Sequence, residues 1–188
     1  MKFSRMFVRS SIVAVLLLPL VASTLVVRAQ SADSAEISQL LVDAKSHAGS
    51  LQDDAATLNS FVRSKLHWKS HAGKLSAMRT HVNELGQINQ KLADLRVTGS
   101  PWQQTAIEQI DPLLREMANH LNATINHLND NQSRIHMREY RDYVHASHEL
   151  ASRTAGMIRD FVDYDEAKSK ADTLEAKLEL PSDDKVAD

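Results

Sequence analysis

The most constraining feature of the chain is residues 100–131, a segment with a marked beginning and one apolar face. Ser100 and Pro101 are typical of a helix N-cap followed by the first helical position, and Gln103 can return the capping contact. Apolar residues then recur at helical spacing, namely Ile107, Ile110, Leu114, Met117, Leu121 and Leu128. The segment therefore predicts a long amphipathic helix, which must pack against other elements to cover its apolar side.

Three further segments show the same helical spacing, and none alternates in the way a strand does. We expect helices over residues 33–65, 68–97, 101–129 and 135–179, with Asp33 and Glu36 forming a capping box at the start of the first. Pro112 should kink or restart the third helix, because proline removes a backbone donor. The polar residues 181–188 should form a disordered tail.

Long amphipathic helices joined by short loops can bury their apolar faces only against one another. The sequence therefore predicts an all-α fold over residues 30–180, an antiparallel up-down-up-down four-helix bundle with a long fourth helix. This last helix exceeds the others by about ten residues, which is about 15 Å at 1.5 Å per residue. From Asp165 onward it should overhang or cover the start of the first helix.

The first 29 residues have the features of a signal peptide. Three basic residues precede an apolar run over residues 12–27, and Val27 and Ala29 leave small side chains at a cleavage site after Ala29. Pro19 inside the run favours cleavage over the alternative, an uncleaved membrane anchor. We expect a periplasmic or secreted protein that has no membrane segment after cleavage, and the absence of cysteine excludes a lipid-anchored lipoprotein.

The charge balance bears on possible partners. The predicted leader contains 4 of the 22 basic residues and none of the 24 acidic ones, so the remaining chain has a net charge near −6. Nucleic acid is therefore not an expected partner, because binding to phosphates requires a basic surface. A protein partner is compatible with the sequence, which does not indicate its identity.

Histidine is the residue type in this chain that is most able to form a functional site. On the predicted bundle, four of the nine histidines lie near the end where the second helix begins, four lie deeper in the same half, and His47 alone lies in the other half. His67 and His71, like His145 and His148, have a spacing at which two rings can reach one ion. The candidate ligands of a transition metal or haem are His67, His71, His120, His127 and His148.

Two other interpretations of these histidines compete with a metal or haem site. The favoured one is that they are ordinary amphipathic residues at helix–helix edges, with no cofactor. The other is a pH-responsive bundle, because clustered imidazoles gain charge between about pH 5 and 8 and then repel one another. No Glu-x-x-His or Cys-x-x-Cys-His motif is present to support a di-iron or covalent haem site.

Several polar and aromatic residues have plain structural interpretations. The acidic run around Asp163 could bind calcium or magnesium, but a solvated charged face next to Lys168 is favoured. Asn89 should be a buried polar group that fixes helix register. The tryptophans should close the two ends of the core, and the tyrosines should direct their hydroxyls to water; these residues are Trp68, Trp102, Tyr140, Tyr143 and Tyr164.

The segments WKSHAGKLSAMRTHVNELG, SPWQQTAIEQIDPLLREMANHL and YRDYVHASHELASRTAGMIRDFVDYDEAKSK carry a resemblance over residues 68–180. They resemble a group of exported, all-helical bacterial proteins of unassigned function. The resemblance implies a fold and a compartment and supplies no catalytic or binding residues.

No nucleophile elbow, phosphate-binding loop or pair of catalytic carboxylates is present in the sequence. We therefore expect a non-enzymatic protein with a binding or structural role in the cell envelope.

Overall fold

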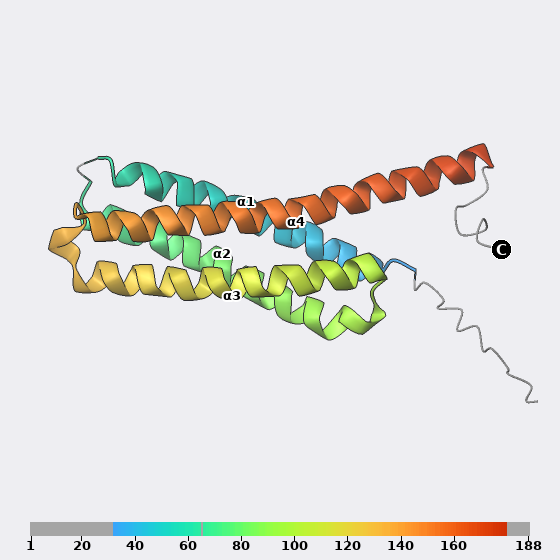
Figure 1. Cartoon of the computed structure of the whole chain (residues 1–188), viewed down its shortest axis with the longest axis horizontal. Helices are drawn as coiled ribbons and strands as arrows, with labels where there is room; N and C mark the ends of the chain where they lie inside the picture. Colours follow the sequence, from blue (N-terminus) through green and yellow to red (C-terminus); the bar gives the residue numbers. More distant parts are fainter. Residues whose placement is uncertain (1–31, 65, 180–188) are drawn as a thin grey trace, which may run out of the picture.

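The computed structural model describes residues 32–64 and 66–179, and four long helices account for most of them (Figure 1). Their bounds are α1 Ala35–Phe61, α2 Trp68–Leu95, α3 Pro101–Asp130 and α4 Arg138–Leu178, with short 3-10 helices η1 Arg96–Thr98 and η2 Gln132–Arg134. Within the described ranges there is no strand. The predicted all-α class is confirmed, while the predicted leader 1–29 and tail 181–188 lie outside the described residues.

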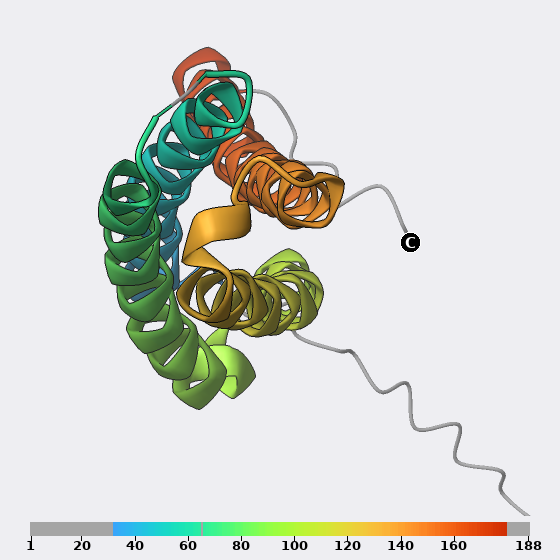
Figure 2. The ribbon, with the colours of Figure 1, turned by 90° about the vertical axis from the view of Figure 1, so that its left-hand side faces the viewer.

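The helices form a closed ring in which each packs against two others. α1 contacts α2, α2 contacts α3, α3 contacts α4, and α4 returns to α1 (Figure 2). Short connections join successive helices, so neighbours run antiparallel. This arrangement confirms the predicted up-down-up-down bundle. The end that contains the α1–α2 turn and the α3–α4 connection is called the pocket end, and the end that contains Ser34 and Ser100 is called the cap end.

The apolar stripes read from the sequence form the core. All six stripe residues of α3 are buried, and so are the residues of α2 at the same spacing: Leu75, Met78, Val82, Leu85, Ile88 and Leu92. α1 contributes small residues to the core, among them Ala44, Ala48 and Ala55, each at most 1% exposed. Trp68 and Trp102 pack against the core from opposite ends, as predicted. Burial of these periodic faces is the main source of stability for a bundle of this kind.

The start of α1 differs from the prediction. Ser34, not Asp33, is the N-cap residue, and its Oγ accepts a hydrogen bond from the Ile37 N–H at 3.4 Å. The Asp33 carboxylate instead accepts from Trp102 Nε1–H at 2.7 Å and pairs with Lys168 at 3.0 Å. The predicted capping box is wrong because this carboxylate is engaged by α3 and α4, contacts that one segment of sequence does not reveal.

Gln103 joins α1 to α3 at the cap end. Its Oε1 accepts from the N–H groups of Ser34 at 2.9 Å and Ser100 at 3.1 Å. Its Nε2 donates to the Ser34 carbonyl at 2.9 Å and to Ser38 Oγ at 3.2 Å. The side chain is fully buried, so one amide satisfies polar groups of two helix starts inside the core. The predicted contact between Gln103 and Ser100 is confirmed.

Helix boundaries at the pocket end also differ from the prediction. α1 ends at Phe61 rather than at residue 65. Near this end Ser60 Oγ donates to the Thr57 carbonyl, and Ser64 Oγ donates to the Phe61 carbonyl. The Phe61 carbonyl, one of the terminal carbonyls of α1, therefore has its partners in the turn that follows the helix, namely the Ser64 hydroxyl and backbone N–H. α4 begins at Arg138 rather than at residue 135, after η2.

α3 does not restart at Pro112, as the sequence had suggested it could. The helix runs without interruption from Pro101 to Asp130. Pro112 and Glu108, whose carbonyl loses its helical donor, are both exposed, so water can solvate that carbonyl.

α4 is the longest helix, as predicted, and its end projects beyond the other three (Figure 1). Its last buried residue is Val162, and Lys168 still reaches Asp33 just before α1. Residues 163–178 are called the α4 extension. None of the helices in residues 32–64 and 66–179 is long and apolar enough to cross a membrane.

Gly99 is expected to tolerate no side chain, whereas other glycines should. A Cβ at Gly99 would lie 2.8 Å from Ile37 Cδ1 and 3.2 Å from Gln103 Cβ. Gly99→Ala should therefore lower the free energy of unfolding by about 1–3 kcal/mol, as overpacking does. Gly86→Ala is the matched control: nothing lies within 4 Å of a Cβ at this helical position, and alanine should stabilise by about 0.5–1 kcal/mol. Urea unfolding measures both changes, and equal shifts would contradict the close packing at Gly99.

Candidate functional site

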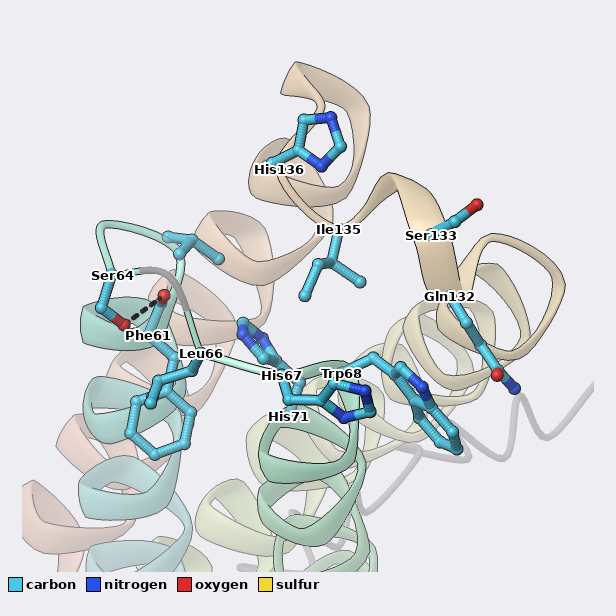
Figure 3. A pocket seen from close by; sticks show the side chains of 11 residues that line it. Phe61, Ser64, Leu66, His67, Trp68, His71, Gln132, Ser133, Ile135 and His136 are labelled. Atoms are coloured by element: carbon cyan, nitrogen blue, oxygen red, sulfur yellow. Dashed lines mark hydrogen bonds between the residues drawn. The ribbon is translucent and has the colours of Figure 1, made fainter.

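A hollow lined by the two connections lies at the pocket end. It has a volume of about 830 Å³ and is called the pole pocket (Figure 3). Its apolar walls come from the end of α1, the turn that follows, the start of α2 and the segment after η2, with Phe61, Val62, Leu66, Trp68 and Ile135. Its polar lining consists of Ser64, His67, His71, Gln132, Ser133 and His136.

The pocket exists because two connections cross the bundle end without closing it. α1 ends at Phe61 and α2 begins at Trp68, and the described residues between them, 62–64 and 66–67, lie at this end of the bundle. His67 begins α2 as its N-cap, and its Nδ1 accepts from the Lys69 N–H at 3.3 Å. Nδ1 of His67 is therefore occupied within its own helix end.

His71 lies at the border between the pocket and the core. It is 1% exposed, and its Nδ1 lies 3.1 Å from the Tyr140 hydroxyl. The ring packs edge-on against Phe61 and Tyr140, at centroid distances of 5.6 and 5.4 Å. Burial lowers the pKa of the His71 imidazole, which favours its neutral form. Its Nε2 is buried and has no hydrogen-bond partner among the described residues.

Tyr140 does not face water as predicted. It is 1% exposed, and burial raises the pKa of its hydroxyl, which therefore stays protonated at neutral pH. The ring belongs to the apolar stripe of α4, and His71 on α2 supplies a partner for the hydroxyl. A partner on another helix removes the usual reason for this group to remain in water.

Five aromatic rings extend from α2 through α4 to α3, and they are called the histidine–tyrosine row: His71, Tyr140, His127, Tyr143 and His120. The His127 ring stacks beside Tyr140 at 6.1 Å and lies 4.8 Å from Tyr143. His120 Nε2 lies 3.0 Å from the Tyr143 carbonyl oxygen. The sequence placed these histidines in the same half of the bundle, with His120 deeper than His71 and His127, but did not indicate that tyrosines would separate them.

The candidate metal ligands divide into separate environments. His67 and His71 line the pole pocket, together with His136. His120 and His148 line a second hollow of about 700 Å³ between α3 and α4, where His148 Nδ1 is buried without a partner among the described residues. His127 lies between the two tyrosines. Among residues 32–64 and 66–179, no three histidine or acidic side chains are arranged to hold one metal ion.

His47 and His81 form a pair that the sequence assigned to different halves. Their Nδ1 atoms lie 3.5 Å apart, and His81 Nε2 lies 3.7 Å from Asp54 Oδ2. The Asp54 carboxylate also pairs with Lys74 at 2.8 Å. The assignment to separate halves is wrong because each histidine lies about 14 residues from the pocket end, on helices that run antiparallel.

The remaining polar candidates have structural partners. Asp163 pairs with Lys45 of α1 at 2.8 Å, and Glu166 lies 4.0 Å from the same ammonium group. This arrangement favours the charged-face interpretation of the acidic run. Asn89 is half-buried rather than buried, and its Nδ2 donates to Asp111 Oδ1 at 2.7 Å, which links α2 to α3.

A third hollow lies at the cap end. This groove of about 300 Å³ between α3 and α4 is lined by Trp102, Thr105, Met157, Asp160, Phe161 and Tyr164. Trp102 and Tyr164 meet edge-on there, with ring centroids 5.3 Å apart. The two tryptophans of the chain therefore lie at two different hollows, Trp68 at the pole pocket and Trp102 at this groove.

Fold and geometry define the chain as an all-α four-helix bundle with the pole pocket at one end and a smaller groove at the other. Comparison of the chain with protein-family models, curated proteins and solved structures finds no match. The resemblance to exported helical proteins of unassigned function therefore stays a prediction.

Proposed function

We propose that this chain is an exported, non-enzymatic helical bundle that binds a ligand in the cell envelope, and that the pole pocket is its binding site. The observation that supports this proposal is the pocket itself. Its volume of about 830 Å³ falls within the range typical of small-molecule sites, roughly 300–1,000 Å³. Aromatic and aliphatic side chains, here five of the eleven lining residues, supply the apolar contact area that such sites use.

The lining indicates the class of ligand. Phe61, Leu66 and Trp68 offer aromatic and aliphatic contact area, which favours a flat or apolar molecule. His67, His136 and Gln132 provide nearby hydrogen-bonding groups. An aromatic molecule with a carboxylate or hydroxyl substituent would match both parts of the lining.

The two tryptophans permit a direct fluorescence test. Trp102→Phe leaves Trp68 as the reporter of the pole pocket, and Trp68→Phe leaves Trp102 as the reporter of the cap-end groove. We expect the fluorescent probe N-phenyl-1-naphthylamine to accept excitation energy from Trp68 in the first variant, with saturation at micromolar probe. The second variant should show a much weaker, non-saturating response.

A stronger, saturable signal in Trp68→Phe than in Trp102→Phe would assign binding to the groove at the cap end and contradict the proposal. If neither variant gave a saturable signal, the chain would not bind apolar aromatic molecules. Thermal unfolding of both variants without probe serves as a control for folding.

A second candidate function is metal or haem binding by the histidines of the pocket end. The observation that favours it is that His67, His71 and His136 line one pocket. Zinc, copper, nickel and haem, tested separately in the same tryptophan variants, should then raise the melting temperature, because a ligand bound only by the folded state stabilises it. Variants with His67→Ala and His136→Ala should no longer show this increase in melting temperature. An unchanged increase would mean that the metal or haem binds at other residues.

The third candidate, a pH-responsive bundle, is supported by the histidine–tyrosine row and the buried His71.

Export itself is tested separately, by sequencing the N-terminus of the protein recovered from the cell envelope fraction. A chain that begins at Gln30 would agree with the predicted cleavage, and an intact leader would contradict it.

A further inference from the structure

The α4 extension presents an apolar stripe that its own chain leaves exposed, although the first member, Tyr164, packs edge-on against Trp102. The stripe, called the outer stripe, consists of Tyr164, Ala167, Ala171, Leu174 and Leu178, all of them exposed. The three large side chains are 50%, 46% and 61% exposed in chain order. Exposed apolar side chains in such a continuous row are typical of an interaction surface rather than of scattered surface residues.

The polarity of α4 reverses where the helix leaves the bundle. Successive residues of a helix are rotated by about 100°, so the outer stripe continues the side of α4 that faces away from the core. Within the bundle that side is charged and exposed, with Asp142, Glu149, Arg153 and Asp160. In the extension the core-facing side is mostly polar instead, with Asp165, Ser169 and Asp172. The extension therefore contacts its own bundle through ion pairs of Asp163, Glu166 and Lys168, and its apolar side faces outward, where a partner can pack.

The spacing within the outer stripe is that of a coiled coil. Its members follow one another at intervals of three, four, three and four residues, which are the a and d positions of a heptad. With Tyr164 at position a, Lys170 is at position g and Glu175 at position e. In a parallel, in-register pair of helices, a g residue faces the e residue five positions later on the partner. Lys170 of each copy would then face Glu175 of the other.

We propose that the α4 extension pairs with the same segment of a second copy of this chain, as a short parallel two-stranded coiled coil. Charge complementarity supports a second copy as the occupant, because each chain carries both members of the Lys170–Glu175 pair. In the described part of the chain the ion pairs of the α4 extension involve Asp163, Glu166, Lys168 and Asp172, and neither Lys170 nor Glu175 takes part. The next g–e′ pair, Asp163 with Lys168, is also opposite in charge, although each already has a partner within its chain.

An antiparallel pair fits the charges less well. In the antiparallel registers that match a with d positions, Lys170 would face either Lys177 or Lys170 of the other copy, which is repulsive. In the parallel pair the two bundles lie on opposite sides of the coiled coil, because each outer stripe faces away from its own core. The two-fold symmetry closes the assembly as a dimer.

Two alanine-to-glutamate substitutions test the surface. Sedimentation velocity of the chain from Gln30 to Asp188 should show a reversible monomer–dimer equilibrium between micromolar and millimolar concentration. Ala171→Glu places a charge at a central a position and should abolish the dimer. Ala176→Glu makes the same change at an exposed f position and should leave the dissociation constant unchanged. Circular dichroism should show the same bundle melting in both variants, since neither residue belongs to the core.

Charge reversal tests the orientation. Lys170→Glu and Glu175→Lys should each raise the dimer dissociation constant by about tenfold, because each creates two like-charge contacts per dimer. The double variant should restore the original value. An antiparallel pair in which Lys170 faces Lys177 would instead be strengthened by Lys170→Glu. A chain that stays monomeric at millimolar concentration would overturn the proposal, and the stripe would then bind another protein or residues 180–188. Equal dissociation constants for the two alanine variants would also overturn it.

Discussion

Replacing Gln103 with alanine should lower the free energy of unfolding by about 2–4 kcal/mol, because several buried polar groups lose their partner together. The lost bonds are those to the N–H groups of Ser34 and Ser100, the Ser34 carbonyl and Ser38 Oγ. Truncation also leaves a cavity between the starts of α1 and α3, since Gln103 is fully buried. Urea unfolding followed by circular dichroism measures the effect.

Two variants distinguish this network from general effects of mutating α3. Gln109→Ala makes the same substitution at an exposed position of the helix and should change stability by no more than about 0.5 kcal/mol. Gln103→Glu keeps an acceptor for the two N–H groups but cannot donate in its ionised form, so it should be destabilising at neutral pH and less so in acid. If Gln103→Ala were no more destabilising than Gln109→Ala, the amide network would not hold the cap end together.

Acidification should destabilise the bundle through His71, and His71→Leu should remove that part of the pH dependence. Burial lowers the pKa of His71 below its unfolded value of 6.5, so the unfolded chain binds the proton more readily. Stability from this residue is therefore fully present above about pH 6.5 and is lost as pH falls toward the folded pKa. In that window one proton contributes a slope of at most about 1.4 kcal/mol per pH unit.

The measurement is the free energy of unfolding from pH 5 to 8 for the original chain and the variant. His145→Leu is the matched control, because His145 is exposed and pairs with Glu149 on the surface of α4. His71→Leu also leaves the Tyr140 hydroxyl without its partner, so it should lower stability at every pH. The readout is accordingly the slope, and an unchanged slope in His71→Leu would remove His71 as a source of the pH response.

The helices and their packing could be predicted from the sequence because the spacing of apolar residues indicates which side of each helix is buried. The stripe of α3 and the contact between Gln103 and Ser100 are local patterns, and both are confirmed. The end of α1 was misplaced because no glycine or proline marks it; in the structure Ser64 bonds to the Phe61 carbonyl in the turn that follows the helix.

The features that sequence reasoning missed depend on residues distant in the chain. Gln103 lies 69 residues from Ser34, and His71 lies 69 residues from Tyr140. Periodicity shows that each residue faces inward or lies at an edge, but the partner depends on how two helices are aligned. The burial of Tyr140 and the adjacency of His47 and His81 were missed for the same reason.

A binding role at the pole pocket is tested most directly by nuclear magnetic resonance of the ¹⁵N-labelled chain from Gln30 to Asp188, titrated with N-phenyl-1-naphthylamine. Binding in the pocket predicts saturable amide shifts that are confined to residues 61–72 and 132–136, with the Trp68 indole N–H among them. Shifts centred instead on Trp102 and Tyr164, or no saturable shifts at the pocket end, would contradict the proposed site.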